Sequence, residues 1–182
     1  MSLKRISRRG ILTSGAAAVT AATIGTPSVA DAAVSEKKGI RTIVSEGLGR
    51  IVILSFDRGE KLREGIRDKM AEVGIKNAVI VSAIGTFEKA RFHRIKNVNQ
   101  YPEDEIIEID DAMELSSVDG IIADGEPHFH MTFQDMDRAY SAHLEDGSIV
   151  CYLAEIVLAE IKGVELIRIK NEYGIPLLHE KK

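Results

Sequence analysis

The clearest pattern in the chain is a helical repeat of apolar residues that lies between runs of β-branched residues. Leu62, Ile66, Met70 and Val73 follow one another at steps of four, four and three, with charged residues between them. This spacing predicts an amphipathic helix, since residues three and four apart share one helix face. Gly74 follows directly, and glycine is typical of the left-handed position that ends a helix.

Runs rich in Ile and Val predict strands on both sides of this helix. Ile40–Ser45 and Arg50–Phe56 precede it, and the turn-like sequence Glu46-Gly47-Leu48-Gly49 separates them. The runs that follow it are Ala78–Ile84, Glu88–Ile95, Glu105–Ile109, Val118–Ala123, His128–Phe133, Ile149–Leu158 and Val164–Ile169. One helix among so many strands predicts an α+β fold, a mostly antiparallel sheet with the main amphipathic helix packed on one face.

The first 32 residues have a different pattern, that of a secretory signal peptide. A basic head containing Arg8 and Arg9 precedes the uncharged, small-residue stretch Ile11–Ala30, and Ala-x-Ala-like sites end at Ala30 and Ala32. We therefore expect export to the periplasm or the cell exterior, with cleavage after Ala30 or Ala32. The sequence around the two arginines resembles the twin-arginine export motif. An ordinary signal peptide with a chance arginine pair is the alternative.

Length and composition indicate one globular domain behind this segment. The predicted organisation is a signal peptide over residues 1–32, a linker over 33–39, a domain over 40–175 and a C-terminal tail over 176–182. The chain has 182 residues, 45% of them hydrophobic, and one cysteine, Cys151. A lone cysteine excludes an intramolecular disulfide framework, and its apolar neighbours indicate an inert core thiol.

The charge of the predicted mature chain argues against nucleic acid as a partner. Removing the four basic residues and the one acid of residues 1–32 leaves 20 basic and 27 acidic residues, a net charge of −7. A surface with this excess of acids repels a phosphate backbone unless its cations cluster. The chain also has no Trp and only 5% aromatic residues, which leaves little for base stacking.

The candidate chemistry lies in three histidines, His128, His130 and His143. Residues i and i+2 of a strand point to the same side, roughly 7 Å apart, so His128 and His130 can converge on one metal ion. We expect His143 to arrive after a loop over 135–142 and to complete a three-nitrogen site with one open position. The alternative is a set of solvent-facing histidines that bind nothing.

Zinc is the divalent metal that we expect, since imidazole nitrogens suit it, although copper and nickel bind such sites at least as well. The ligands must be neutral, so metal affinity should fall as the pH drops through the histidine range near ~6.5. Four carboxylates near the histidines in sequence are candidates for hydrogen-bonding to a metal-bound imidazole or for carrying a proton: Glu126, Asp135, Asp137 and Glu155.

The two remaining histidines are interpreted as ordinary. His179 falls in the tail, where we expect it to be solvated. His93 alternates with Lys89 and Arg91 on a basic strand. This cluster could hold an anion, but a charged edge strand that blocks aggregation is the favoured interpretation.

Together these residues resemble the PPC domain family (plants and prokaryotes conserved, DUF296). The resemblance covers roughly residues 40–172 and rests on Gly59-Glu60-x-Leu62, Ala83-Ile84-Gly85-Thr86-Phe87-x-x-Ala90, Glu114-Leu115-x-x-x-x-Gly120, Pro127-His128-Phe129-His130, His143-Leu144-x-x-Gly147 and Ala154-Glu155-Ile156-Val157. It implies a mixed α+β fold assembled as a homotrimer. It further implies, as in some bacterial and archaeal members, a metal held by His128, His130 and His143 near a subunit interface.

One departure from the family pattern concerns the turn before His143. The family shows Gly-Gly-His, whereas this chain has Ser141-Ala142-His143. If the family glycines need a positive φ, Ser141 and Ala142 must be accommodated differently.

Three functions remain open. The first is an exported homotrimer that binds a metal or small ligand at the three histidines. The second is a metal-dependent hydrolase that uses the same histidines, with Glu155 or Glu126 as proton carrier. The third is a DNA-binding protein by family analogy, which the net charge, the lack of an Arg-Gly-Arg-Pro AT-hook core and the expected export oppose.

Overall fold

The computed structural model describes residues 4–6 and 39–182. The predicted signal peptide and linker therefore lie outside the described residues, except for a short strand near the N-terminus and Gly39. The elements are β1 (Lys4–Ile6), β2 (Gly47–Asp57), α1 (Leu62–Glu72), β3 (Ala78–Ile95), β4 (Asp104–Ala123), β5 (Glu126–Gln134), β6 (Ala139–Leu144), β7 (Ile149–Lys162), β8 (Leu166–Lys170) and β9 (Pro176–Glu180).

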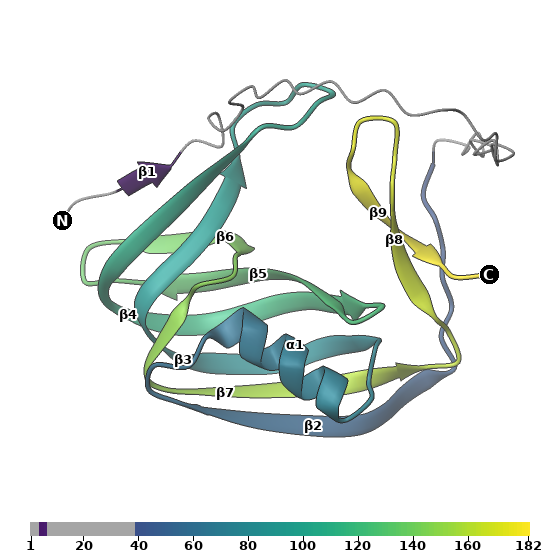
Figure 1. Cartoon of the computed structure of the whole chain (residues 1–182), viewed down its shortest axis with the longest axis horizontal. Helices are drawn as coiled ribbons and strands as arrows, with labels where there is room; N and C mark the ends of the chain where they lie inside the picture. The colour runs from purple at the N-terminus through teal and green to yellow at the C-terminus, as the bar shows by residue number, and fades with distance from the viewer. Residues whose placement is uncertain (1–3, 7–38) are drawn as a thin grey trace, which may run out of the picture.

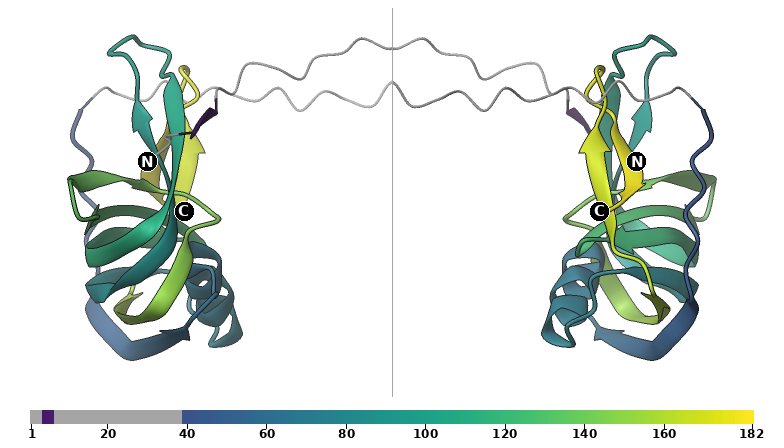
Figure 2. Two further views of the ribbon diagram at one scale, coloured as in Figure 1. Left: turned by 90° about the vertical axis from the view of Figure 1, so that its left-hand side faces the viewer. Right: turned by 90° about the vertical axis from the view of Figure 1, so that its right-hand side faces the viewer.

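Seven strands form one antiparallel sheet in the order β1-β4-β5-β6-β3-β7-β2, and β4 also pairs with β3 (Figure 1). Strands β3, β4, β5 and β6 therefore close a ring. The ring closes where Phe92 faces Leu144 and His93 faces His143. Strands β8 and β9 form a separate hairpin, which stands at one end of the sheet in Figure 1 and therefore in front of the sheet in the right-hand view of Figure 2.

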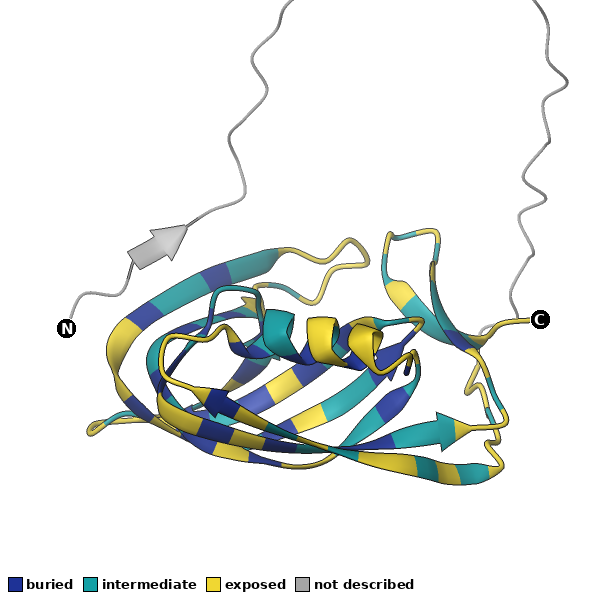
Figure 3. Cartoon of the chain, turned by 60° about the horizontal axis from the view of Figure 1, so that its bottom comes forward, coloured by how far each residue is buried: buried dark blue, intermediate teal, exposed yellow. Residues whose placement is uncertain are grey.

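Helix α1 lies across one face of the curved sheet, as predicted (Figure 3). Leu62, Ile66 and Met70 are at most 1% exposed, and Gly74 follows with a φ of +70°. In the described part of the chain, no helix is long and apolar enough to cross a membrane. The helix shares its core with buried side chains from the strands, the largest being Phe87, Phe129, Phe133, Ile122, Met131, Leu144, Ile156 and Leu158.

The predicted strands are present except for the first, but several merge. The runs Ala78–Ile84 and Glu88–Ile95 form the single strand β3, and Glu105–Ile109 and Val118–Ala123 join in β4. The prediction for Ile40–Ser45 is wrong, because these residues are not in a strand. Ile40 and Val44 in this run are 100% and 78% exposed, so most of its apolar side chains do not pack against the sheet.

Two strands were missed by the sequence analysis. β6 occupies part of the predicted loop over 135–142 and continues through His143, and β9 occupies most of the predicted tail over 176–182. Neither has a strong alternating pattern of its own. β6 forms because β5 and β3 supply hydrogen-bonding partners, and β9 forms because β8 does.

The basic strand is also corrected by the structure. β3 has partners along both sides and is not an edge, so the charged-edge interpretation is wrong. Its cations pair across the strands with β4 acids: Lys89 lies 3.2 Å from Asp110, and Arg91 lies 3.1 Å from Glu108. These partners balance the positive charge of the strand.

The turn between β4 and β5 fixes the position of the first histidine. Asp124 and Gly125 have φ angles of +51° and +82°, which is the pattern of a two-residue hairpin turn. This turn fixes a register in which His128 faces Ile121 and His130 faces Asp119.

Candidate metal centre

The candidate site is a row of histidines that crosses three neighbouring strands. His130 of β5 faces His143 of β6, and His143 in turn faces His93 of β3. Residues directly opposite one another in an antiparallel sheet lie on the same face. His128 joins the row because it lies two residues before His130 on β5, whereas Phe129 between them points into the core.

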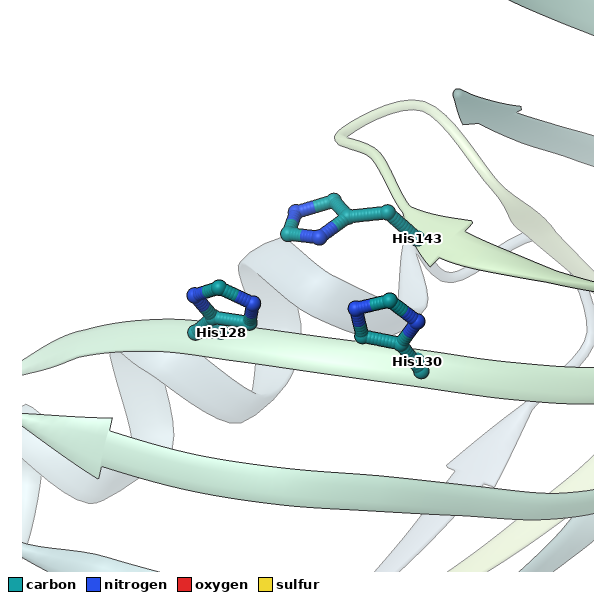
Figure 4. A group of neighbouring side chains, drawn as sticks. All are labelled: His128, His130 and His143. Atoms are coloured by element: carbon teal, nitrogen blue, oxygen red, sulfur yellow. The ribbon is translucent and has the colours of Figure 1, made fainter. Parts of the chain in front are cut away.

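The three predicted ligands come together, as Figure 4 shows. Ring centroids lie 5.7 Å apart for His128 and His130, 4.8 Å for His128 and His143, and 5.3 Å for His130 and His143. One ligand nitrogen from each ring lies within 4.8 Å of the other two. In a tetrahedral zinc site with bonds of 2.0–2.1 Å the ligand nitrogens lie about 3.4 Å apart, so the three rings would have to turn toward one another to close the site.

His93 and Glu145 form a second group with His143, and the sequence analysis missed it. The His93 ring stacks on His143 at 4.3 Å, and its Nδ1 lies 2.6 Å from Glu145 Oε1. The interpretation of His93 as an ordinary basic-strand residue is therefore wrong. No spacing in the sequence reveals this contact, because it depends on the pairing of β3 with β6.

The surroundings favour the neutral form of two ligands. Burial, followed by the positive charges that His93 and His128 carry when protonated, lowers the pKa of His143 to about 4. Burial and then the charge of Arg168 lower the pKa of His128. A lowered pKa keeps an imidazole neutral at more acidic pH, so protons compete less with a metal than at a free histidine. The loss of metal affinity, which the sequence alone placed near pH ~6.5, should therefore shift to lower pH.

Glu145 supplies the negative charge beside the histidines. Its hydrogen bond with His93 is the main reason that the pKa of this carboxyl is lowered. An ionised carboxylate bonded to an imidazole Nδ1 fixes the tautomer and orientation of the ring, as acids do around bound metals.

Ser141 and Ala142, which replace the family glycines, lie in extended conformation within β6. Ser141 faces Thr132 and Ala142 faces Met131. Among the described residues, Asp124 is the one non-glycine with a positive φ. A left-handed turn is therefore not needed to deliver His143 to the site.

The predicted carboxylates do not join the histidines within one chain. Glu126 lies 2.6 Å from Arg63 of the helix, and Asp135 accepts a hydrogen bond from the Tyr140 hydroxyl at 2.9 Å. Glu155 faces Ile84 on β3, nine residues before His93, which is about 30 Å along a strand.

Asp137 also keeps to its own turn, where its backbone N–H donates to the Asp135 carboxylate at 2.8 Å. The acids that contact the cluster are two that the sequence analysis did not single out: Glu145, 2.6 Å from His93 Nδ1, and Asp104, 3.9 Å from His93 Nε2.

Solved structures share this fold. The metal-containing protein from Archaeoglobus fulgidus is 26% identical with a TM-score of 0.65, and the match covers 76% of this chain and all of that one. A plant- and prokaryote-conserved (PPC) protein from Pyrococcus horikoshii is 28% identical with a TM-score of 0.65, and the match covers 79% of this chain and 99% of that one. A hypothetical protein from Salmonella is 16% identical with a TM-score of 0.66, and the match covers 76% of this chain and 98% of that one. At this identity the likeness is evidence of a shared fold only. No curated protein matches the chain in sequence.

The family comparison agrees with the fold and with the order of the sequence motifs. The sequence model of the Plants and Prokaryotes Conserved (PCC) domain family matches residues 43–162. This is the family to which the sequence motifs above were compared under the abbreviation PPC. This match spans more than half of the chain and includes every histidine of the cluster. The chain therefore belongs to the Plants and Prokaryotes Conserved domain family.

Proposed function

We propose that this chain is an exported, homotrimeric metal-binding protein in which His128, His130 and His143 hold one divalent ion, with zinc as the expected metal. The observation that carries the proposal is the convergence of three imidazoles from two paired strands, with one nitrogen of each within 4.8 Å of the others. The similar protein from Archaeoglobus fulgidus is described as metal-containing, which supports the same reading. A three-nitrogen set leaves a fourth position for water or a small ligand.

The direct test is elemental analysis of protein purified without a His tag. We expect close to one metal ion per chain, removed by a chelator and restored by zinc. Purified protein that contains no metal and takes up none when zinc is added would overturn the proposal.

A metal-dependent hydrolase is the second candidate, and the His93–Glu145 pair is the observation that favours it. A metal with an open position can activate water, and a histidine–carboxylate pair beside it can accept the proton. Of the proton carriers first considered, Glu126 is held in an ion pair with Arg63, and Glu155 lies on another part of the sheet. A panel of ester, phosphate and amide substrates tests this candidate, with Glu145→Gln as the variant that should lose activity but keep metal.

We expect the mature protein to be a homotrimer by light scattering, as the family resemblance implies. Apolar side chains on the face of β2 and β3 that points away from the core would suit such contacts, with exposures of 73% for Ile53, 56% for Ile51 and 48% for Ile84. Ile53→Lys should reduce the mass to that of a monomer if this face is the interface. Ile95→Lys, at an exposed position eleven residues from Ile84 at the far end of β3, is the control. A wild-type monomer at micromolar concentration contradicts the trimer.

Export should depend on the arginine pair. Replacing both Arg8 and Arg9 by Lys should leave the uncleaved precursor in the cytoplasm, because the twin-arginine route reads the two arginines. Fractionation and immunoblotting of the tagged precursor measure this. Unchanged export of the double variant would contradict the twin-arginine route, although not secretion itself.

A further inference from the structure

Arg168, on the β8–β9 hairpin beyond the residues that the family model matches, is a cation with an unused donor close to the histidine row. Its Nη1 atom is buried and donates no hydrogen bond to any described residue. A buried guanidinium nitrogen without an acceptor is costly, and such groups commonly mark the place of a ligand.

The hairpin is tied to the turn that precedes His128. The side-chain oxygen of Asn77 accepts hydrogen bonds from the backbone N–H groups of Asp124, at 3.2 Å, and of Leu166, at 3.3 Å. Asp124 belongs to the β4–β5 turn and Leu166 begins β8, so one amide fixes both segments. In Figure 1 the hairpin stands beside the end of the sheet at which β4 ends and β5 begins.

Arg168 lies on the same side of β8 as Leu166, which is 4% exposed and is held beside the β4–β5 turn, and its charge acts on one candidate ligand, His128. Among charged groups, Arg168 has the largest effect on the pKa of His128, which it lowers. Burial lowers the pKa of Arg168, and the one acid whose charge opposes this is Glu126. Glu126 is itself bound by Arg63. The guanidinium therefore lacks an ion-pair partner of its own within the described chain.

We propose that the site binds a small oxyanion, a carboxylate or a phosphate, which takes the open position on the metal and accepts a hydrogen bond from Arg168. This inference rests on the proposed metal site. Guanidinium groups suit carboxylates and phosphates because their planar donors match the geometry of these anions. A metal ion together with a partly buried guanidinium favours an anion over a neutral molecule of the same shape.

The test uses the cobalt-substituted protein, whose visible absorption changes when a ligand enters the metal coordination sphere. Acetate and inorganic phosphate are titrated separately at constant ionic strength, and acetamide serves as the neutral analogue of acetate. We expect saturable spectral changes with at least one of the two anions and none with acetamide. Arg168→Gln should weaken binding of that anion by about 10- to 100-fold, the loss expected for one charge-assisted hydrogen bond. Arg168→Lys should recover part of it.

Lys170→Gln is the matched control, because Lys170 is exposed on the same strand and its substitution removes the same charge. If both Gln variants weaken anion binding equally, the effect is general electrostatics and the inference is wrong. If cobalt binds but Arg168→Gln leaves anion binding unchanged, or acetamide binds as well as acetate, the inference fails and the metal site stands. If the wild type binds no cobalt, the proposed metal site and the inference fall together.

Discussion

Replacing His130 by Ala should remove most of the metal from the protein. His130 is the central member of the cluster, because it lies next to His128 along β5 and faces His143 across the strand pair. Loss of one of three imidazole ligands should weaken zinc binding by at least about 100-fold, the upper end of the loss typical of partners outside the coordination sphere. Competition with a chromophoric chelator measures the affinity, and elemental analysis measures the occupancy.

His93 is not a suitable control for this experiment. His93 stacks on His143 and bonds to Glu145, so His93→Ala should weaken binding to an intermediate extent rather than leave it unchanged. His179 is the proper control, because it lies on β9 opposite Ile167, on the face of the hairpin away from Arg168. Full occupancy in His130→Ala, His143→Ala and wild type alike would mean that the metal binds elsewhere.

Gly120→Ala should destabilise the fold and disturb the same site. Gly120 has a φ of +134°, and a Cβ at this position would lie 2.1 Å from the His128 carbonyl oxygen. The backbone of β5 would have to move at His128, which is one of the three proposed metal ligands. We expect a loss of about 3 kcal/mol in the free energy of unfolding, from the strained φ and the steric overlap together.

Urea denaturation of the metal-free protein measures this loss, and zinc affinity measures the displacement of His128. Gly174→Ala is the matched control, since its φ is +79° but nothing lies within 4 Å of the added Cβ. It should cost about 1 kcal/mol, the cost of the left-handed conformation alone, and leave zinc binding intact. Equal unfolding midpoints for the two variants would show that close approach to His128 is not the constraint.

The elements that the sequence predicted well have strong local patterns. Helix α1 was predicted at Leu62, because its apolar residues repeat at helical spacing whatever they pack against. Strands β5 and β7 were predicted from β-branched and alternating runs. Strand β6 was missed, since Ala139–Leu144 has a weak pattern and its conformation depends on partners on both sides.

The sequence by itself determined the α+β class, the family, and the pair of histidines on one face of a strand, because these depend on local spacing and on the order of motifs. Only the tertiary structure decided which residues surround the pair. His93 and Glu145 reach His143 because the ring of strands closes between β6 and β3, and the hairpin turn at Asp124 fixes which residues of β4 lie beside His128. Such neighbours are set by strand register between segments distant along the chain, which no local repeat of residues encodes.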